Sequence, residues 1–274
     1  MNCSRETRLK YPALLTFALP KPNVSKPRRS KTGTARKRID VKEEYKRWYS
    51  PTLSKDFEML VYGHYGTPVI VFPSTMGRFF ESKDFKLIDS AAHLVEEGRV
   101  KLFCLDSVDK HSWYNKSVHP ADRIRNHNVY DRFICGEIVN ALRHEYGIQK
   151  VAVAGASFGG YHAVNFALKH PDMVSHVFSM SGSFDIRSFM DGYYGDDVYF
   201  NNPVDYLPGD NNPELWKLNI VLGFGEWDIC KDANLRLSKI LDDKGISHWL
   251  DEYRWAEHDW PLWRQMFPKY LAQI

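Results

Sequence analysis

The sequence lacks the marks of several protein classes. Its 274 residues include 4 cysteines, which are scattered and form no Cys-x-x-Cys pair. Cys104 and Cys135 lie in a strand-like and a helix-like run, where reduced thiols are common core residues. No apolar run approaches the length of a membrane span. Residues 11–20 are a short apolar patch without the small-x-small cleavage site of a signal peptide. We therefore expect a cytoplasmic protein without a membrane span, with secretion as the alternative.

Acidic residues are scarce near the N-terminus. Residues 1–47 hold 14 Lys and Arg against 4 Asp and Glu, so they carry +10, whereas the whole chain carries +3 and the rest therefore −7. Residues 1–42 also have almost nothing apolar to bury, which predicts a basic, disordered extension. A nucleic-acid or anionic-surface arm and a transit peptide are the functional alternatives. The mildly acidic body, residues 43–274, gives no indication of nucleic-acid binding.

The body alternates strand-like and helix-like segments. Its length suits one α/β domain, and 43% hydrophobic with 26% charged residues is ordinary globular composition. We expect strands at 43–50, 57–62, 67–72, 100–105, 150–154, 174–181, 219–223 and 247–254, and helices at 84–97, 122–146, 158–169, 233–244 and 261–273. This alternation predicts an α/β fold, with a mostly parallel sheet covered by helices on both faces. Residues 184–213, rich in Asp, Asn, Tyr and Gly, are expected to form a cap-like insertion rather than core.

The segment 151–160, Val-Ala-Val-Ala-Gly-Ala-Ser-Phe-Gly-Gly, is the most informative stretch. An apolar strand runs into Gly-x-Ser-x-Gly and a helical pattern follows at once, which is the context of a nucleophile elbow. Gly155 and Gly159 avoid the Cβ atoms that would collide in so sharp a turn. We predict that Ser157 is a nucleophile at the carboxyl edge of the sheet.

A serine nucleophile needs a base and an acid that orients the base, and in this arrangement they follow the serine in chain order. Asp228 lies in a loop after the strand at 219–223 and is the expected acid, with Glu226 and Asp232 as rivals. His258 lies between the last strand and the last helix and is the expected base. His162 is expected to pack on the elbow helix, and His248 lies within a strand.

The oxyanion hole needs two backbone N–H groups. One should belong to Phe158, the residue after the nucleophile, and the other to the loop after the strand at 67–72. Within that loop, Pro73-Ser-Thr-Met-Gly77, Thr75 is the expected donor and Met76 the next candidate.

With these motifs in view, the chain resembles the putative-esterase family of α/β-hydrolases. The resemblance rests on Gly155-Ala-Ser-Phe-Gly159, Gly225-Glu-Trp-Asp228, Glu257-His-Asp-Trp260, Ser112-Trp-Tyr-Asn115 and His119-Pro120, and it extends from about residue 43 to the C-terminus. The group includes feruloyl esterases, S-formylglutathione hydrolases, enterochelin esterases and mycolyltransferases. It implies an α/β-hydrolase fold and a carboxylic-ester hydrolase that acts on a small-molecule ester and uses no metal or cofactor.

Aromatic residues in the predicted loops on the ligand side suggest the pocket lining. We expect Trp113, Tyr114, Trp227 and Trp260 to contact substrate, because aromatic pockets favour apolar acyl or aryl groups; packing of the long loops is the alternative for each. Arg123 and Arg125 are expected to be solvated helix charges.

The leading hypothesis is a serine esterase with a Ser-His-Asp triad and an acyl-enzyme. An acyltransferase on the same triad and a non-catalytic binding module with a hydrolase fold are the alternatives. The sequence does not indicate the acyl chain length or the oligomeric state.

Overall fold

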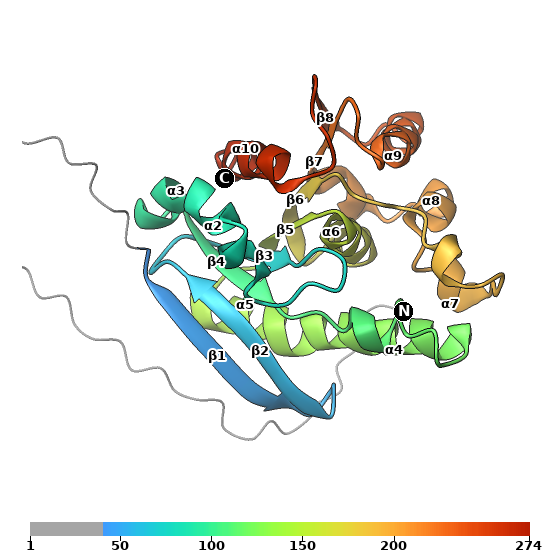
Figure 1. The fold of residues 1–274 in the computed structure, drawn as a ribbon, viewed down its shortest axis with the longest axis horizontal. Coiled ribbons are helices and arrows are strands. Elements are labelled where there is room, and N and C mark those ends of the chain that lie inside the picture. The colour runs from blue at the N-terminus through green and yellow to red at the C-terminus, as the bar shows by residue number, and fades with distance from the viewer. Residues whose placement is uncertain (1–40) are drawn as a thin grey trace, which may run out of the picture. The chain divides into compact units, whose positions relative to one another are not determined.

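A computed structural model describes residues 41–274, so the predicted basic extension lies outside the described residues apart from its last two positions. The described chain forms an eight-stranded sheet in the order β1-β2-β4-β3-β5-β6-β7-β8 (Figure 1). The strands are β1 (Glu43–Ser50), β2 (Lys55–Tyr62), β3 (Thr67–Phe72), β4 (Val100–Leu105), β5 (Val151–Ala156), β6 (Val174–Met180), β7 (Asn219–Gly225) and β8 (His248–Tyr253). From β4 to β8 all neighbours are parallel, whereas β2 pairs antiparallel with both β1 and β4. The predicted, mostly parallel α/β sheet is confirmed.

Helices cover both faces of this sheet (Figure 1). One face carries α4 (Pro120–Phe133), α5 (Asn140–Tyr146), α6 (Phe158–Lys169) and α9 (Lys231–Asp243), and the other carries the short helices α1 (Glu81–Asp84), α2 (Leu87–Ser90) and α3 (Ala92–Glu96) with α10 (Trp260–Leu271). The alternation of side chains along a strand feeds both cores. In β3, for example, Ile70 and Phe72 join the first core, whereas Val69 and Val71 join the second.

Two predicted helices are not regular. The helix expected at 84–97 is three short pieces, because Lys86 adopts a left-handed φ of 59° and the chain turns again at Ala91. The helix expected at 122–146 begins at Pro120 and contains a π-helical stretch, Ile134–Val139, between α4 and α5. The break at Lys86 has no glycine or proline, whereas the π-helical stretch contains Gly136, a residue that weakens a helix and was the one local signal of an irregularity there.

The segment 184–213 corrects the cap prediction. It contains the short 3-10 helix Arg187–Phe189 together with α7 (Asp196–Tyr199), α8 (Pro203–Tyr206) and the 3-10 turn Leu207–Gly209. Several of its apolar side chains are buried in the clusters that line the sheet and α6, among them Phe184, Ile186, Val198, Val204 and Leu207. The segment therefore contributes to the core as well as to the rim of the ligand side. Across the described residues, no helix is long and apolar enough to cross a bilayer.

Candidate active site

Ser157 occupies a sharp turn between β5 and α6. Its backbone has φ 54° and ψ −120°, a strained conformation for a residue with a side chain. The flanking glycines are required by space: a Cβ on Gly155 would lie 2.2 Å from the carbonyl oxygen of Gly159, and one on Gly159 would lie 2.5 Å from that of Phe72. The elbow therefore presses directly against the end of β3. The start of α6 also points unpaired N–H groups toward this region.

Three side chains from separate loops meet at this turn. The Oγ of Ser157 lies 2.9 Å from Nε2 of His258, and Nδ1 of the same imidazole lies 2.7 Å from Oδ1 of Asp228. His258 follows β8 and Asp228 follows β7, so adjacent parallel strands deliver both residues to one edge of the sheet. The side chain of His258 is 15% exposed, whereas that of Asp228 is completely buried. The hydrogen bonds from Ser157 through His258 to Asp228 form a continuous relay. The alternative candidates for the acid, Glu226 and Asp232, do not join it, and Glu226 instead accepts the N–H of Trp255.

The carboxylate of Asp228 is held in its ionised form. Burial alone raises its pKa, but hydrogen bonds from His258, the Ser181 hydroxyl and the N–H of Cys230 outweigh burial, so the pKa of Asp228 lies below its ordinary value. Ser181 is itself fixed by a bond from the indole N–H of Trp263, 2.9 Å long, and that indole also packs edge-on against His258 at 5.2 Å. Sequence reasoning missed both supporting residues. The position of Ser181 just after β6, at the same sheet edge, was the available signal.

The loop after β3, residues 73–77, hereafter the oxyanion loop, lies beside the elbow. Three of its backbone N–H groups have acceptors: Ser74 donates to Glu81 at 2.7 Å, Met76 to Asp109 at 3.2 Å and Gly77 to the carbonyl of Ser74 at 2.9 Å. Among the described residues, the N–H groups of Thr75 and Phe158 have no protein acceptor. Both predicted oxyanion donors thus have an N–H group available to a ligand.

Two aromatic side chains flank Phe158 on the ligand side. Tyr114 packs edge-on against Phe158 with ring centroids 5.8 Å apart, and Phe189 lies 5.1 Å from both rings. The hydroxyl of Tyr114 lies 3.5 Å from that of Thr75. Trp113 corrects the sequence prediction: it is 0% exposed and packs behind these rings, so it cannot touch a substrate in this conformation. Phe189 was not among the aromatic residues predicted to contact substrate, although it lies in the segment 184–213 that was expected on the ligand side.

On the side of the relay, indole rings are exposed. Trp227 is 55% and Trp255 72% exposed, and their centroids are 5.5 Å apart in an edge-on pair. Trp260 is half-buried and stacks on Phe85 at 4.4 Å. Of the four aromatic residues predicted to contact substrate, Tyr114, Trp227 and Trp260 therefore have exposed surface, and whether they contact substrate stays a prediction.

Arg123 also differs from its prediction. It is buried, donates to the carbonyl oxygens of Asn115 and Phe189, and pairs with Asp191 at 2.6 Å. It therefore ties the chain around Phe189 to α4 instead of meeting solvent. Arg125 remains on the surface as expected and pairs with Asp122.

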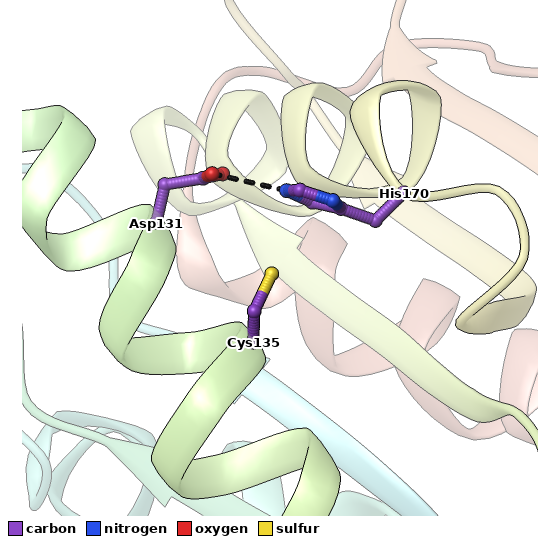
Figure 2. A group of neighbouring side chains, drawn as sticks. All are labelled: Asp131, Cys135 and His170. Carbon is purple, nitrogen blue, oxygen red and sulfur yellow. Dashed lines mark hydrogen bonds and ion pairs between the residues drawn. The ribbon is translucent and has the colours of Figure 1, made fainter. Parts of the chain in front are cut away.

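A second Asp–His pair, Asp131 and His170, lies at the other end of α6, and the thiol of Cys135 lies near it (Figure 2). Asp131 on α4 meets His170 at 3.0 Å, and donor atoms of these two residues and Cys135 lie within 4.8 Å of one another. Zinc uses such ligands. Here, however, the ammonium group of Lys169 lies 3.4 Å from the other carboxylate oxygen of Asp131, so a cation already balances this carboxylate. We assign the group to the packing of α4 on α6. A second group of possible metal ligands consists of Asp228, Cys230 and His258. Two of these residues, Asp228 and His258, form the hydrogen-bonded relay with Ser157.

Comparison with known proteins shows the family of this chain and its fold. The family described as "Putative esterase" matches residues 50–274. No curated protein matches the chain. A ferulic acid esterase structure is 17% identical, covers 85% of this chain and 97% of its own, and gives a TM-score of 0.67. The structure of S-formylglutathione hydrolase FrmB from Staphylococcus aureus is 12% identical. It covers 85% of this chain and 98% of its own, with a TM-score of 0.64. The structure of the ferulic acid esterase AmCE1/Fae1A from Anaeromyces mucronatus is 15% identical. It covers 87% of this chain and 92% of its own, with a TM-score of 0.63. At these identities the structures show a shared fold.

Proposed function

Because the chain belongs to the putative-esterase family and is an esterase, we propose that it hydrolyses carboxylic esters through Ser157, His258 and Asp228. The observation that carries this proposal is the continuous relay from the Ser157 hydroxyl through both imidazole nitrogens of His258 to the carboxylate of Asp228. It has the arrangement of a nucleophile, a general base and a group that orients the base.

In the proposed reaction the Oγ of Ser157 attacks the ester carbonyl carbon while His258 Nε2 takes the hydroxyl proton. The N–H groups of Phe158 and Thr75 receive the oxyanion that forms. When the tetrahedral intermediate collapses, the C–O bond to the alcohol breaks, and His258 returns its proton to that alcohol. Water, deprotonated by the same imidazole, then attacks the acyl-enzyme and releases the carboxylic acid. The low pKa of Asp228 keeps this carboxyl ionised, so that it stabilises the imidazolium ion in both halves of the reaction.

The surroundings of Ser157 support an aromatic or short apolar acyl group as the substrate. Tyr114 and Phe189 form an aromatic flank beside Phe158, and Trp227, which precedes Asp228 in the chain, forms an exposed apolar surface together with Trp255. Such surfaces favour apolar groups over charged ones. Two of the similar structures are ferulic acid esterases, whose named substrate class is aromatic.

The test is hydrolysis of p-nitrophenyl acetate, butyrate and benzoate by the wild type and Ser157→Ala, with a fluorophosphonate probe and intact mass measurement alongside. We expect turnover and a single mass adduct in the wild type, and a loss of at least about 1,000-fold with no adduct in Ser157→Ala. Ser90→Ala, which removes a hydroxyl that bonds only to the carbonyl of Leu87 in α2, is the matched control and should retain both. A folded wild type that neither turns over nor takes the probe would refute the proposal and favour a binding module. Ester exchange with an added alcohol, in place of release of the free acid, would indicate acyl transfer.

A further inference from the structure

A buried carboxylate outside the relay joins the two halves of the proposed oxyanion hole. Asp109 lies in the short 3-10 helix Asp109–His111, after the carboxyl end of β4, and is 0% exposed. One of its oxygens, Oδ1, lies 3.0 Å from Nε2 of His162, and the other, Oδ2, accepts the N–H of Met76 at 3.2 Å. Buried carboxylates are rare unless they are paired. The bonds to His162 and Met76 therefore allow Asp109 to be buried.

These partners adjoin the two proposed oxyanion donors. Met76 directly follows Thr75 in the oxyanion loop. His162 lies one turn along α6 from Phe158, so both side chains fall on the same side of that helix, and their rings pack edge-on at 5.0 Å. Thr75 and Phe158 are 83 positions apart in the sequence. Asp109 therefore links, through one side chain, two segments whose relative position sets the geometry of the hole.

The oxyanion loop needs such support, because Met76 holds a left-handed φ of 57°. A residue with a side chain keeps this conformation only when its surroundings impose it. The segment 106–109 supplies several of the contacts: Asp106 pairs with Arg78 at 2.8 Å, Ser107 donates to the carbonyl of Gly77 at 3.0 Å, and Asp109 accepts from Met76.

On its other side the loop is held by a second carboxylate. Glu81 accepts both the N–H and the hydroxyl of Ser74, each at 2.7 Å. Thr75 thus lies between two residues whose N–H groups are held by buried or half-buried carboxylates, while its own N–H has no acceptor among the described residues. Fixing both neighbours fixes the peptide plane that carries the Thr75 N–H.

From these contacts we propose that Asp109 is a positioning residue for the oxyanion hole. This inference rests on the proposed function. By holding Met76 and His162 together, Asp109 sets the distance between the N–H groups of Thr75 and Phe158 before a substrate binds. Its effect is expected in the transition state, where the oxyanion forms, and not in the binding of the neutral ester.

The test compares Asp109→Ala and Asp109→Asn in the full chain with Asp131→Ala, a matched control that removes a second buried aspartate from a histidine on the same helix, also 3.0 Å away. The measurements are kcat and KM for p-nitrophenyl acetate, the rate of fluorophosphonate labelling, and hydrogen exchange of peptides covering residues 73–80. We expect Asp109→Ala to lower kcat and the labelling rate at least about tenfold with KM within threefold, and to speed exchange in the oxyanion loop. Asp109→Asn, whose amide can accept from Met76 and donate to His162, should recover kcat to within about threefold.

Asp131→Ala should lower thermal stability and leave kcat within about twofold. A folded Asp109→Ala protein with wild-type kcat would overturn the inference, as would an Asp131→Ala protein that loses kcat to the same degree. If Asp109→Ala does not fold, Asp109→Ser, which can keep one of the two partners, replaces it and should give an intermediate kcat; a wild-type value would be equally contrary. A wild type without turnover would instead refute the proposed function. In that case the exchange measurement would still decide whether Asp109 holds the loop.

Discussion

Two of the Asp–His pairs in the described residues differ in the imidazole nitrogen that meets the carboxylate, Nδ1 in His258 and Nε2 in His170, and above all in their surroundings. In the pair Asp228–His258, the second imidazole nitrogen faces the Ser157 hydroxyl at 2.9 Å, and the ring keeps 15% of its surface exposed at the edge of the sheet. In the pair Asp131–His170, the carboxylate also meets the ammonium of Lys169, and the residues lie buried between α4 and the end of α6. The first pair ends at the serine that we propose as the nucleophile, whereas the second ends in an ion pair.

The comparison shows that an Asp–His bond acquires a role from what the remaining atoms meet. In the proposed reaction Ser157, held by a strained backbone, gives the imidazole of His258 a proton to accept. Lys169 instead compensates the charge of Asp131, which makes that group a brace between two helices. Asp109–His162 lies between these cases, because its histidine is on the elbow helix and its carboxylate reaches the oxyanion loop.

The largest expected effect breaks the first pair. Asp228→Asn keeps the size of the side chain but removes the charge that orients and stabilises His258, so kcat for p-nitrophenyl acetate should fall about 10,000-fold. The urea midpoint should change little, because the amide oxygen can still accept the N–H of Cys230. Glu226→Gln is the matched control and should stay within about threefold of wild type. If Glu226→Gln lost activity and Asp228→Asn did not, the assignment of the acid would be wrong.

The next effect concerns stability and its dependence on pH. Burial alone raises the pKa of Asp131, but Lys169 and His170 outweigh burial and hold this pKa well below its ordinary value. The folded-state pKa is then lower than the unfolded one, so the pair stabilises the fold fully above about pH 4, and this contribution shrinks progressively below that pH until it is lost as the pH falls through the folded-state pKa. Asp131→Asn should lower the unfolding free energy at pH 7 by about 3 kcal/mol, with kcat retained.

Urea unfolding from pH 7 down to pH 3 measures this effect. The difference between wild type and Asp131→Asn should shrink as the pH falls. Asp243→Asn, which changes an exposed aspartate paired with Lys239, is the control for a general charge effect. A difference that stays constant from pH 7 to pH 3 would contradict the assigned pKa direction.

The smallest effect tests the cation that distinguishes the two pairs. Lys169→Gln removes the ammonium group near Asp131 and weakens its bond to Asn201, 2.9 Å long in the wild type. The unfolding free energy at pH 7 should fall by about 1 kcal/mol, less than in Asp131→Asn, because His170 still faces the carboxylate. Lys239→Gln, on an exposed pair, should leave the urea midpoint unchanged. Equal effects of the two lysine substitutions would mean that Lys169 contributes no more than a surface charge.

Much of the fold could be predicted from local patterns. The continuous apolar run at 67–72 forms β3 at the expected position, because a parallel strand buried on both faces needs apolar residues throughout, and the strand expected at 100–105 forms β4. The break at Lys86 was not predictable, since it carries no glycine or proline, whereas Gly136 within the π-helical stretch was a weak local signal that a regular helix would be interrupted. The core role of segment 184–213 was missed because its burial depends on α6 and on the sheet beneath it.

For the site, the sequence by itself determined the elbow and which residues could join it. Gly-x-Ser-x-Gly between a strand and a helix has few other physical uses, and parallel strands bring the loops of Asp228 and His258 to the same edge. Only the tertiary structure decided that Trp113 is buried, that Arg123 ties a loop to α4, and that Asp109 links the oxyanion loop to His162. Periodicity describes which face of an element turns inward. Which distant side chain it meets there depends on how the layers pack, and that information is not local.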